Sequence, residues 1–215
     1  MVEVKVLKNR DEWLKNRTKI GGSDASCIVG MNPYKSNVDL WLEKTEDNEE
    51  IHAELLAIKG KDDEILDRFY RNLEFGTAGL RGVLGAGTNR MNIYTVGKAT
   101  QGLANFLTSE KENPVVTISY DSRIRSDEFA KAAAQILAAN GVKVYLYDAL
   151  APVPMLSFAT RAHNSDAGIM ITASHNPAKY NGYKVYDELG CQLVDEACME
   201  VIGFISDVDP FEREL

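Results

Sequence analysis

The stretch GIMITASHNPAKYNGYKVY, from Gly168 to Tyr186, is the most informative part of this chain. The apolar run at 167–171 predicts a buried strand, because a short continuous apolar run bounded by turn signals is typical of strands covered on both faces. The pairs Asn176-Pro177 and Asn181-Gly182 then mark a tight loop. The sequence therefore places the hydroxyl of Ser174 on a constrained loop at the end of a core strand.

Residues that could hold an anion surround this serine. His175 follows it directly, and Lys184 comes later in the same stretch. This arrangement suits a serine that carries a phosphoryl group, because a phosphoserine needs rigid positioning and nearby cations. Each residue alone also has an ordinary interpretation, as a turn serine, a loop histidine and a solvated strand lysine.

A glycine-rich segment, LEFGTAGLRGVLGAGTN at 73–89, contains a further candidate, Arg81. Glycine-rich backbone can approach an anion closely, so Arg81 could contribute to a phosphate site; a surface ion pair is the alternative. The run from Gly82 to Gly87 does not fit G-x-G-x-x-G and follows no clear strand pattern. It predicts turns rather than a dinucleotide-binding loop.

Apolar strands alternate with amphipathic helices from Val115 onward. This alternation predicts an α/β fold: a three-layer α/β/α domain with a mostly parallel mixed sheet, preceded by a short, mainly helical segment. Ligands in such sheets collect at the carboxyl ends of strands, where Asp121 and Ser174 both fall. Ser126 is expected to cap a helix that Asn140-Gly141 ends. We expect strands at 115–120, 142–147 (buried), 167–173 and 182–187, and helices at 127–139, 152–161 and 195–205.

The composition and the cysteine pattern argue against several classes of protein. Of the 215 residues 45% are apolar and 26% are charged, which is typical of a globular protein. The formal net charge of −8 argues against nucleic-acid binding, which needs clustered positive charge. The three cysteines form no C-x-x-C pair, and the amino terminus lacks the apolar core of a signal peptide. We therefore expect a cytoplasmic protein without a membrane segment.

Three stretches of the chain carry a resemblance to a known family, and they occur along the chain in the order that the family has. They are GIMITASHNP, LEFGTAGLRGVLGAGTNRMN and SYDSR (119–123). From about Ile51 onward the chain resembles the α-D-phosphohexomutase superfamily, in its phosphoglucomutase and phosphomannomutase branch. GIMITASHNP is similar to that family's phosphoserine signature. LEFGTAGLRGVLGAGTNRMN is similar to its amino-terminal active-site loop.

The resemblance implies an isomerase of the phosphotransferase type. Ser174 would donate a phosphoryl group to a hexose phosphate, and the resulting hexose bisphosphate would reorient and return its other phosphoryl group. Lys184 matches the general acid/base, Arg81 the arginine that holds the phosphate region, and His175 the neighbour of the serine. Mg²⁺ would bind an oxygen of the Ser174 phosphate. The implied substrate- and phosphate-binding residues are Arg123, Asn176 and Asp121.

The resemblance covers only the first of the family's four domains. The metal loop D-G-D-x-D-R does not occur in this chain. We therefore expect a truncated form that is weak or inactive alone, and self-association through the face that further domains would cover. A remnant that binds sugar phosphates without catalysis is an alternative.

The front of the chain is different. The stretch RTKIGGSDASCIVGMNPYKSNVDLWLEKT (17–45) resembles the opening of the lambda-exonuclease-like, YqaJ-type phage recombinase nucleases. We expect residues 1–45 to be a nuclease-like fragment or a divergent helical lead-in, and residues 46–215 to be the phosphohexomutase domain I. An exonuclease-related fusion protein is the alternative function.

Overall fold

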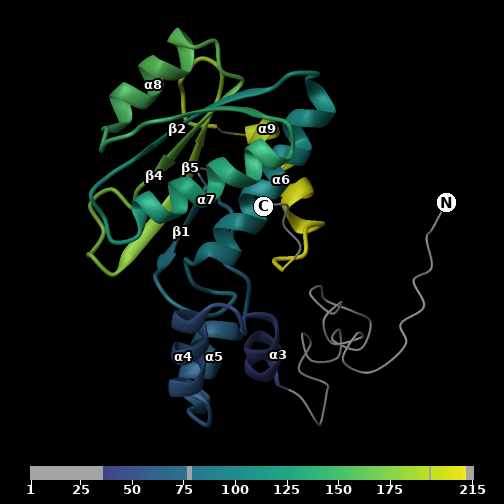
Figure 1. Ribbon diagram of the computed structural model, residues 1–215, viewed down its shortest axis with the longest axis vertical. Helices are drawn as coiled ribbons and strands as arrows, with labels where there is room; N and C mark the ends of the chain where they lie inside the picture. Colours follow the sequence, from purple (N-terminus) through teal and green to yellow (C-terminus); the bar gives the residue numbers. More distant parts are fainter. Residues whose placement is uncertain (1–35, 77–78, 194, 212–215) are drawn as a thin grey trace, which may run out of the picture.

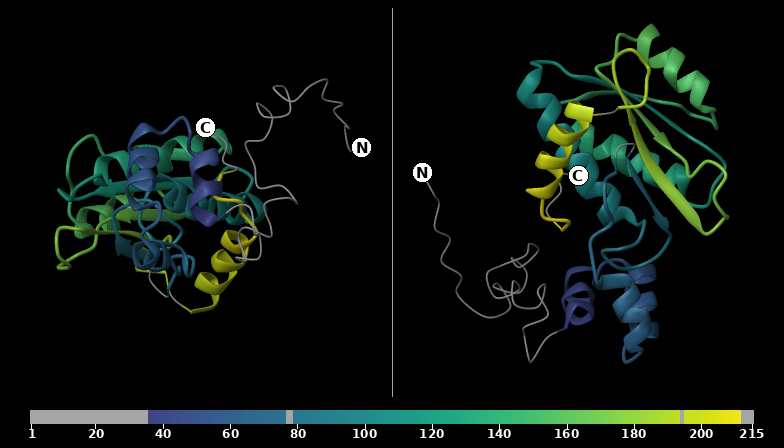
Figure 2. Two further views of the ribbon diagram at one scale, coloured as in Figure 1. Left: turned by 90° about the horizontal axis from the view of Figure 1, so that it is seen from below. Right: turned by 180° about the vertical axis from the view of Figure 1, so that it is seen from behind.

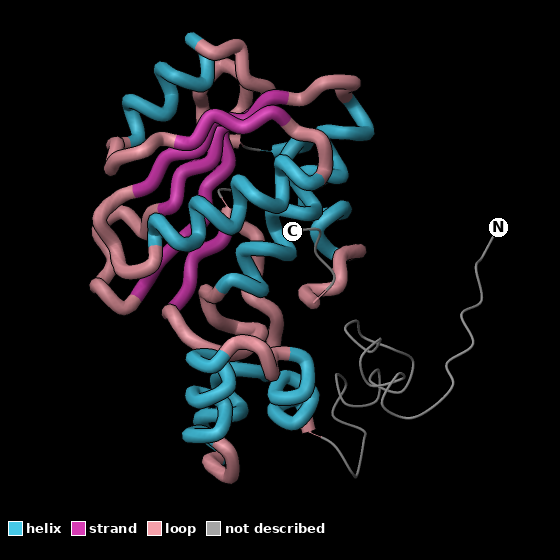
Figure 3. The backbone as a smooth tube through the Cα atoms, viewed as in Figure 1, coloured by secondary structure: helices cyan, strands magenta, loops and turns pink. Residues whose placement is uncertain are grey.

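A single mixed sheet organises the protein, as a computed structural model describes it over residues 36–76, 79–193 and 195–211 (Figure 1). The strand order is β1-β5-β4-β2-β3. β2 pairs in parallel with β3 and β4, whereas β5 runs antiparallel between β4 and β1. The strands, seen side by side in Figure 3, are β1 (Leu80–Val83), β2 (Val115–Tyr120), β3 (Lys143–Leu146), β4 (Ala167–Ile171) and β5 (Tyr180–Tyr186).

Alternating side chains divide this sheet into two faces. Val116, Ile118 and Tyr120 of β2 point into the larger core, which lies beneath three helices. These helices are α6 (Ile93–Glu110), α7 (Ser126–Ala139) and α9 (Asp195–Ser206). α6 and α9 pack on each other, as Figure 2 shows from behind. The arrangement covers one face of the sheet with a helical layer.

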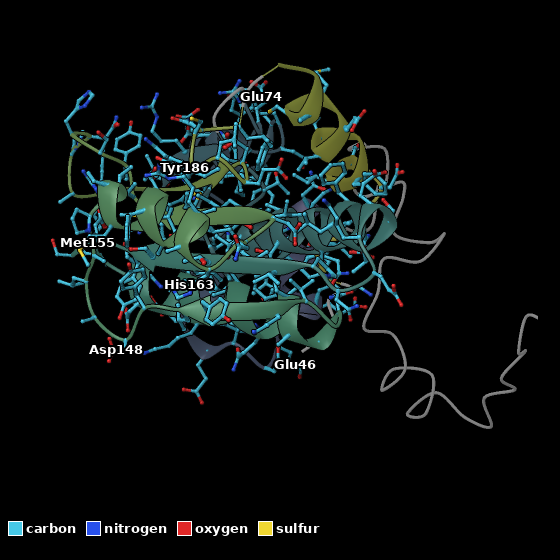
Figure 4. The ribbon with its side chains drawn as sticks, turned by 90° about the horizontal axis from the view of Figure 1, so that it is seen from above. Glu46, Glu74, Asp148, Met155, His163 and Tyr186 are labelled. Atoms are coloured by element: carbon cyan, nitrogen blue, oxygen red, sulfur yellow. The ribbon has the colours of Figure 1, made fainter. Side chains whose placement is uncertain are left out.

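The opposite face carries α8 (Val153–Ala162), which packs against β2 and β4. Leu156 of this helix is buried with Met170 and Tyr186 of the sheet. Figure 4 shows Tyr186 of β5 within the molecule and Met155 of α8 at its margin. The two helical layers confirm the predicted three-layer α/β/α class with a mixed sheet.

Three local predictions need correction. The strand expected to be buried at 142–147 is the edge strand β3, with Lys143 and Leu146 exposed, because an apolar run does not reveal which strand ends a sheet. The run from Gly82 to Gly87, expected to form turns, begins inside strand β1, which includes Gly82 and Val83. Ser126 makes no capping bond and is the first residue of α7 after Arg125, because its hydroxyl donates to Asp121 instead.

From residue 36 onward, where the structure describes the chain, three short helices precede the sheet: α3 (Asn37–Lys44), α4 (Glu49–Ile58) and α5 (Asp62–Phe69). Ser36 and Asp39 form a capping box that starts α3. Trp41 of this helix meets Phe69, Tyr94 and Phe211 edge-on, at centroid distances of 5.6, 5.6 and 5.3 Å.

The contacts of Trp41 bear on the organisation of the chain. Tyr94 belongs to α6, so this apolar cluster ties the lead-in helices to the α/β unit. The boundary expected at residue 45 falls between α3 and α4, which share the cluster. Expectations for residues 1–35, including most of the nuclease-like stretch, lie outside the described residues. Within the described part of the chain, no helix combines the length and apolar character needed to span a bilayer.

Candidate functional site

Ser174 lies on the loop after β4, at the carboxyl end of the strand. Its side chain is exposed, and its backbone has a φ of 55°. This left-handed conformation costs a non-glycine residue about 1–2 kcal/mol, so other groups must hold it. The Ser174 N–H donates to Thr172 Oγ1 at 2.9 Å, and the Ser174 carbonyl accepts from Arg123. The structure thus presents the hydroxyl outward from a backbone that neighbouring groups restrain.

Asp121 connects this loop to the loop after β2. Its Oδ2 accepts from the Thr172 hydroxyl at 2.5 Å, and its Oδ1 accepts from the Arg123 backbone N–H and the Ser126 hydroxyl, each at 3.0 Å. The buried Asn181 on β5 extends the network by donating to Ser126 Oγ at 3.0 Å. Both carboxylate oxygens of Asp121 are therefore occupied by protein donors, and through Ser126 and Asn181 the network joins the ends of β2 and β4 to the start of β5.

The guanidinium of Arg123 lies under the Ser174 loop and is largely buried, with 14% of the side chain exposed. It donates four hydrogen bonds, all to carbonyl oxygens of the loop. The acceptors are Ser174 and Asn176 from Nη2, at 2.6 and 2.7 Å, and Tyr180 and Pro177 from Nη1, at 3.0 and 3.2 Å. Arg123, expected among the phosphate ligands, is here bonded to the backbone that carries Ser174.

Arg81 and Lys184 lie on one face of the sheet. Arg81 on β1 stands opposite Gly182 on β5, and Lys184 follows two residues later, so their side chains leave the same side. Arg81 Nη1 donates to Asn176 Oδ1 at 3.2 Å, which brings it to the Ser174 loop. Lys184 is half-buried, and its side chain has no hydrogen bond or ion pair within the described part of the chain. Its amine is thus available to a ligand.

A hollow of about 370 Å³ opens beside Ser174. His175 is exposed, with Nδ1 3.5 Å from the Ser174 hydroxyl oxygen. The hollow has room for a phosphoryl group on the serine. It is lined by both strand-end loops, through residues 121–124, 174, 176 and 178.

The lead-in helices support the glycine-rich segment that follows Arg81. Glu54 of α4 accepts the Ala86 N–H at 2.8 Å and pairs with Arg68 of α5. Arg68 Nη1 also donates to the Ala86 carbonyl at 3.2 Å. Gly87 has a φ of 123°, and a Cβ there would lie 2.7 Å from the Arg68 carbonyl oxygen. Only glycine fits this turn, which holds β1 and hence Arg81 in place.

The residues present do not form a magnesium site by themselves. Among the described residues no group of three or more His, Cys, Asp or Glu side chains is placed to hold a metal ion. Asp121, the carboxylate beside Ser174, already accepts three hydrogen bonds. The side chains near Ser174 therefore do not fit a protein-only Mg²⁺ ligand set.

Sequence reasoning missed two residues of the site and misassigned a third. Thr172 and Asn181 are buried polar residues that connect the loops. Ser126 bonds Asp121 and Asn181 instead of capping its helix. A signal for Thr172 exists, since a polar residue that ends an apolar strand often bonds the turn after it. The pair Asn181-Gly182 predicts only a turn, so its sequence carries no signal for the buried bond to Ser126.

Comparisons with known proteins agree with this geometry. The sequence profile described as "Phosphoglucomutase/phosphomannomutase, alpha/beta/alpha domain I" matches residues 72–209. A phosphoglucomutase of Staphylococcus haemolyticus is 44% identical over 74% of this chain and 31% of its own length. One of Staphylococcus aureus is 42% identical over 88% of this chain and 33% of its own length. The chain thus spans about a third of the length of these curated relatives.

Solved structures show the same likeness. A protein of Thermus thermophilus assigned as a phosphomannomutase superposes with a TM-score of 0.59 at 32% identity, over 63% of this chain and 30% of its own. Parafusin from Paramecium, with a TM-score of 0.55 and 20% identity over 65% of this chain and 26% of its own, shares the fold. A second profile, "YqaJ-like viral recombinase domain", matches residues 12–65. The front of the chain therefore has a likeness of its own.

Proposed function

Because the chain belongs to the phosphoglucomutase/phosphomannomutase family through its α/β/α domain I, we propose that it is the phosphoryl-carrying domain of a phosphosugar mutase. Its partners are then a hexose phosphate and a hexose bisphosphate. The observation that carries the proposal is the exposed Ser174 hydroxyl, on a left-handed backbone that Thr172 and Arg123 hold in place. Such rigid positioning is the main requirement of phosphoryl transfer.

The reaction moves one phosphoryl group and one proton. The Ser174 oxygen bonds to phosphorus while the bond from phosphorus to a sugar oxygen breaks. The serine loses its proton, and the departing sugar oxygen gains one. Lys184 is suited to this proton transfer because its amine has no protein partner in the described chain. Arg81, on the same sheet face, supplies positive charge next to the loop.

Magnesium enters the proposal only through the phosphate. Bound to an oxygen of phosphorylated Ser174, Mg²⁺ would neutralise part of its charge. Its other ligands do not come from the described residues, and no step above depends on it.

Intact-mass spectrometry tests the proposal directly. The chain is incubated with glucose 1,6-bisphosphate and Mg²⁺, and we expect a mass increase of one phosphoryl group. Ser174→Ala should abolish the increase, whereas Ser122→Ala, a matched exposed serine of the same hollow, should retain it. Absence of uptake by the wild type, or uptake that survives Ser174→Ala, would contradict the proposal.

Turnover is expected to be weak. The described residues lack a carboxylate set for the metal, and much of the charge stabilisation of the transition state is therefore missing. The measurement is coupled conversion of glucose 1-phosphate to glucose 6-phosphate. Sustained turnover comparable to that of a full-length phosphoglucomutase, and lost in Ser174→Ala, would show that this expectation is wrong.

The YqaJ likeness at 12–65 supports a second candidate, a nuclease-related protein. The described part of that segment consists of α3, α4 and the start of α5, and no metal-holding group occurs in the described residues. Digestion of linear duplex DNA across a screen of divalent metals and pH distinguishes the candidates. We expect none.

A further inference from the structure

The terminal nitrogens of the Arg123 guanidinium are occupied by hydrogen bonds within the protein. A guanidinium has about five N–H donors. In Arg123 the two terminal nitrogens make four hydrogen bonds to loop carbonyls, and Nε lies 3.6 Å from Asp121 Oδ2. Arg123 could bind a substrate phosphate only by giving up a bond to the Ser174 loop.

The four carbonyl oxygens surround one guanidinium, two at each terminal nitrogen, and their partial negative charges would repel one another without this cation between them. Hydrogen bonds to a charged donor are stronger than those between neutral groups, particularly where water is excluded. Asp121 completes the arrangement by accepting the Arg123 backbone N–H, so the arginine is fixed at both ends.

We infer that Arg123 is a positioning residue that sets the conformation of the Ser174 loop, not a ligand of the sugar phosphate. Its role in catalysis rests on the proposed function, whereas its role in the loop conformation does not. The planar fork is essential to it, because a lysine ammonium presents its donors from a single atom and cannot reach four separate carbonyls at once. Arg123→Lys therefore keeps the charge and removes the geometry.

Arg125 offers a matched control. It lies in the same segment and is equally buried, with 15% of its side chain exposed against 14% for Arg123. Its side-chain bonds go to Glu128 and Glu50, away from the Ser174 loop. Arg125→Lys thus repeats the same chemical change nearby without touching the loop carbonyls.

Limited trypsin digestion reads the loop independently of any phosphoryl chemistry. Lys179 is exposed in the loop, and the carbonyl of the next residue, Tyr180, accepts from Arg123. We expect Arg123→Lys to raise the rate of cleavage after Lys179 at least roughly tenfold, which corresponds to about 1.4 kcal/mol of local opening free energy. For Arg125→Lys the cleavage rate should stay within about twofold of the wild-type rate, because Arg125 makes no bond to the loop carbonyls and its loss should change the local opening free energy little.

Phosphorylation by glucose 1,6-bisphosphate then separates positioning from binding. If Arg123 positions the loop, Arg123→Lys lowers the maximal rate of Ser174 phosphorylation and leaves the half-saturating bisphosphate concentration unchanged. A raised half-saturating concentration with an unchanged maximal rate would identify a phosphate ligand and overturn the inference.

The remaining outcomes are also decisive. Wild-type cleavage kinetics in Arg123→Lys would overturn the inference. Loss of the whole fold in Arg123→Lys by circular dichroism, with Arg125→Lys still folded, would overturn it as well, since the contribution would then be domain-wide. Faster cleavage after Lys179 with no phosphate uptake by the wild type would support the loop role and contradict the proposed function.

Discussion

Replacing Thr172 with valine tests the hydrogen-bond network beneath Ser174. The substitution preserves the branched shape and removes a hydroxyl that donates to Asp121 at 2.5 Å and accepts the Ser174 N–H at 2.9 Å. Thr172 is only 5% exposed, so water cannot fully replace these bonds. The lost bond to the carboxylate should cost about 1.5–3 kcal/mol and the neutral one about 0.5–1.5 kcal/mol.

Because the Ser174 N–H lies near solvent and can recover a partner, we expect a net loss of about 2–3 kcal/mol in the free energy of unfolding. For a chain of this size the melting temperature should fall by about 5–10 °C. Urea titration at neutral pH measures the free energy, and Thr108→Val, which loses a bond within its own helix, is the control. A change below about 0.5 kcal/mol for Thr172→Val, the scatter of surface substitutions, would refute the reasoning.

Two further substitutions test the core beneath the site. Burial raises the pKa of Tyr183, whose side chain is 0% exposed, so the folded state keeps the phenol protonated where the unfolded chain ionises above about pH 10. Stability present below that pH should decline above it by up to about 1.4 kcal/mol per pH unit. Tyr183→Phe should make this decline less steep in urea titrations at alkaline pH, unlike Tyr70→Phe, since Tyr70 is 55% exposed; equal slopes for both would contradict it. Gly182→Ala should destabilise the chain by about 1–3 kcal/mol and speed proteolysis of the Ser174 loop, because its Cβ would lie 2.6 Å and 2.8 Å from two backbone carbonyl oxygens. Gly203→Ala, in a helix with nothing within 4 Å of the added carbon, should not destabilise it, and similar values for the two variants would count against the steric argument.

The class of the fold and the exposed position of Ser174 follow from the order of the residues alone. Apolar runs and helical periodicity are local properties, and they predicted β2, β4 and the helices after them to within a residue or two. The turn chemistry around Asn176-Pro177 indicated that Ser174 leaves the core, and the structure exposes it. These conclusions need only neighbouring residues, which is why they can be read without coordinates.

The groups that hold Ser174 in place are visible only in the folded chain. Arg123 and Ser174 are 51 residues apart, and nothing local to either shows that the guanidinium ends on the loop carbonyls. The same applies to Asn181, which reads as a turn former and is in fact buried on β5 within the network. Strand order is likewise non-local, so β3 proved to be an exposed edge and β5 an antiparallel strand between β4 and β1. Hydrogen bonds and strand pairings of this kind form when distant segments meet, because each buried polar group takes the partner that the packed fold brings within reach.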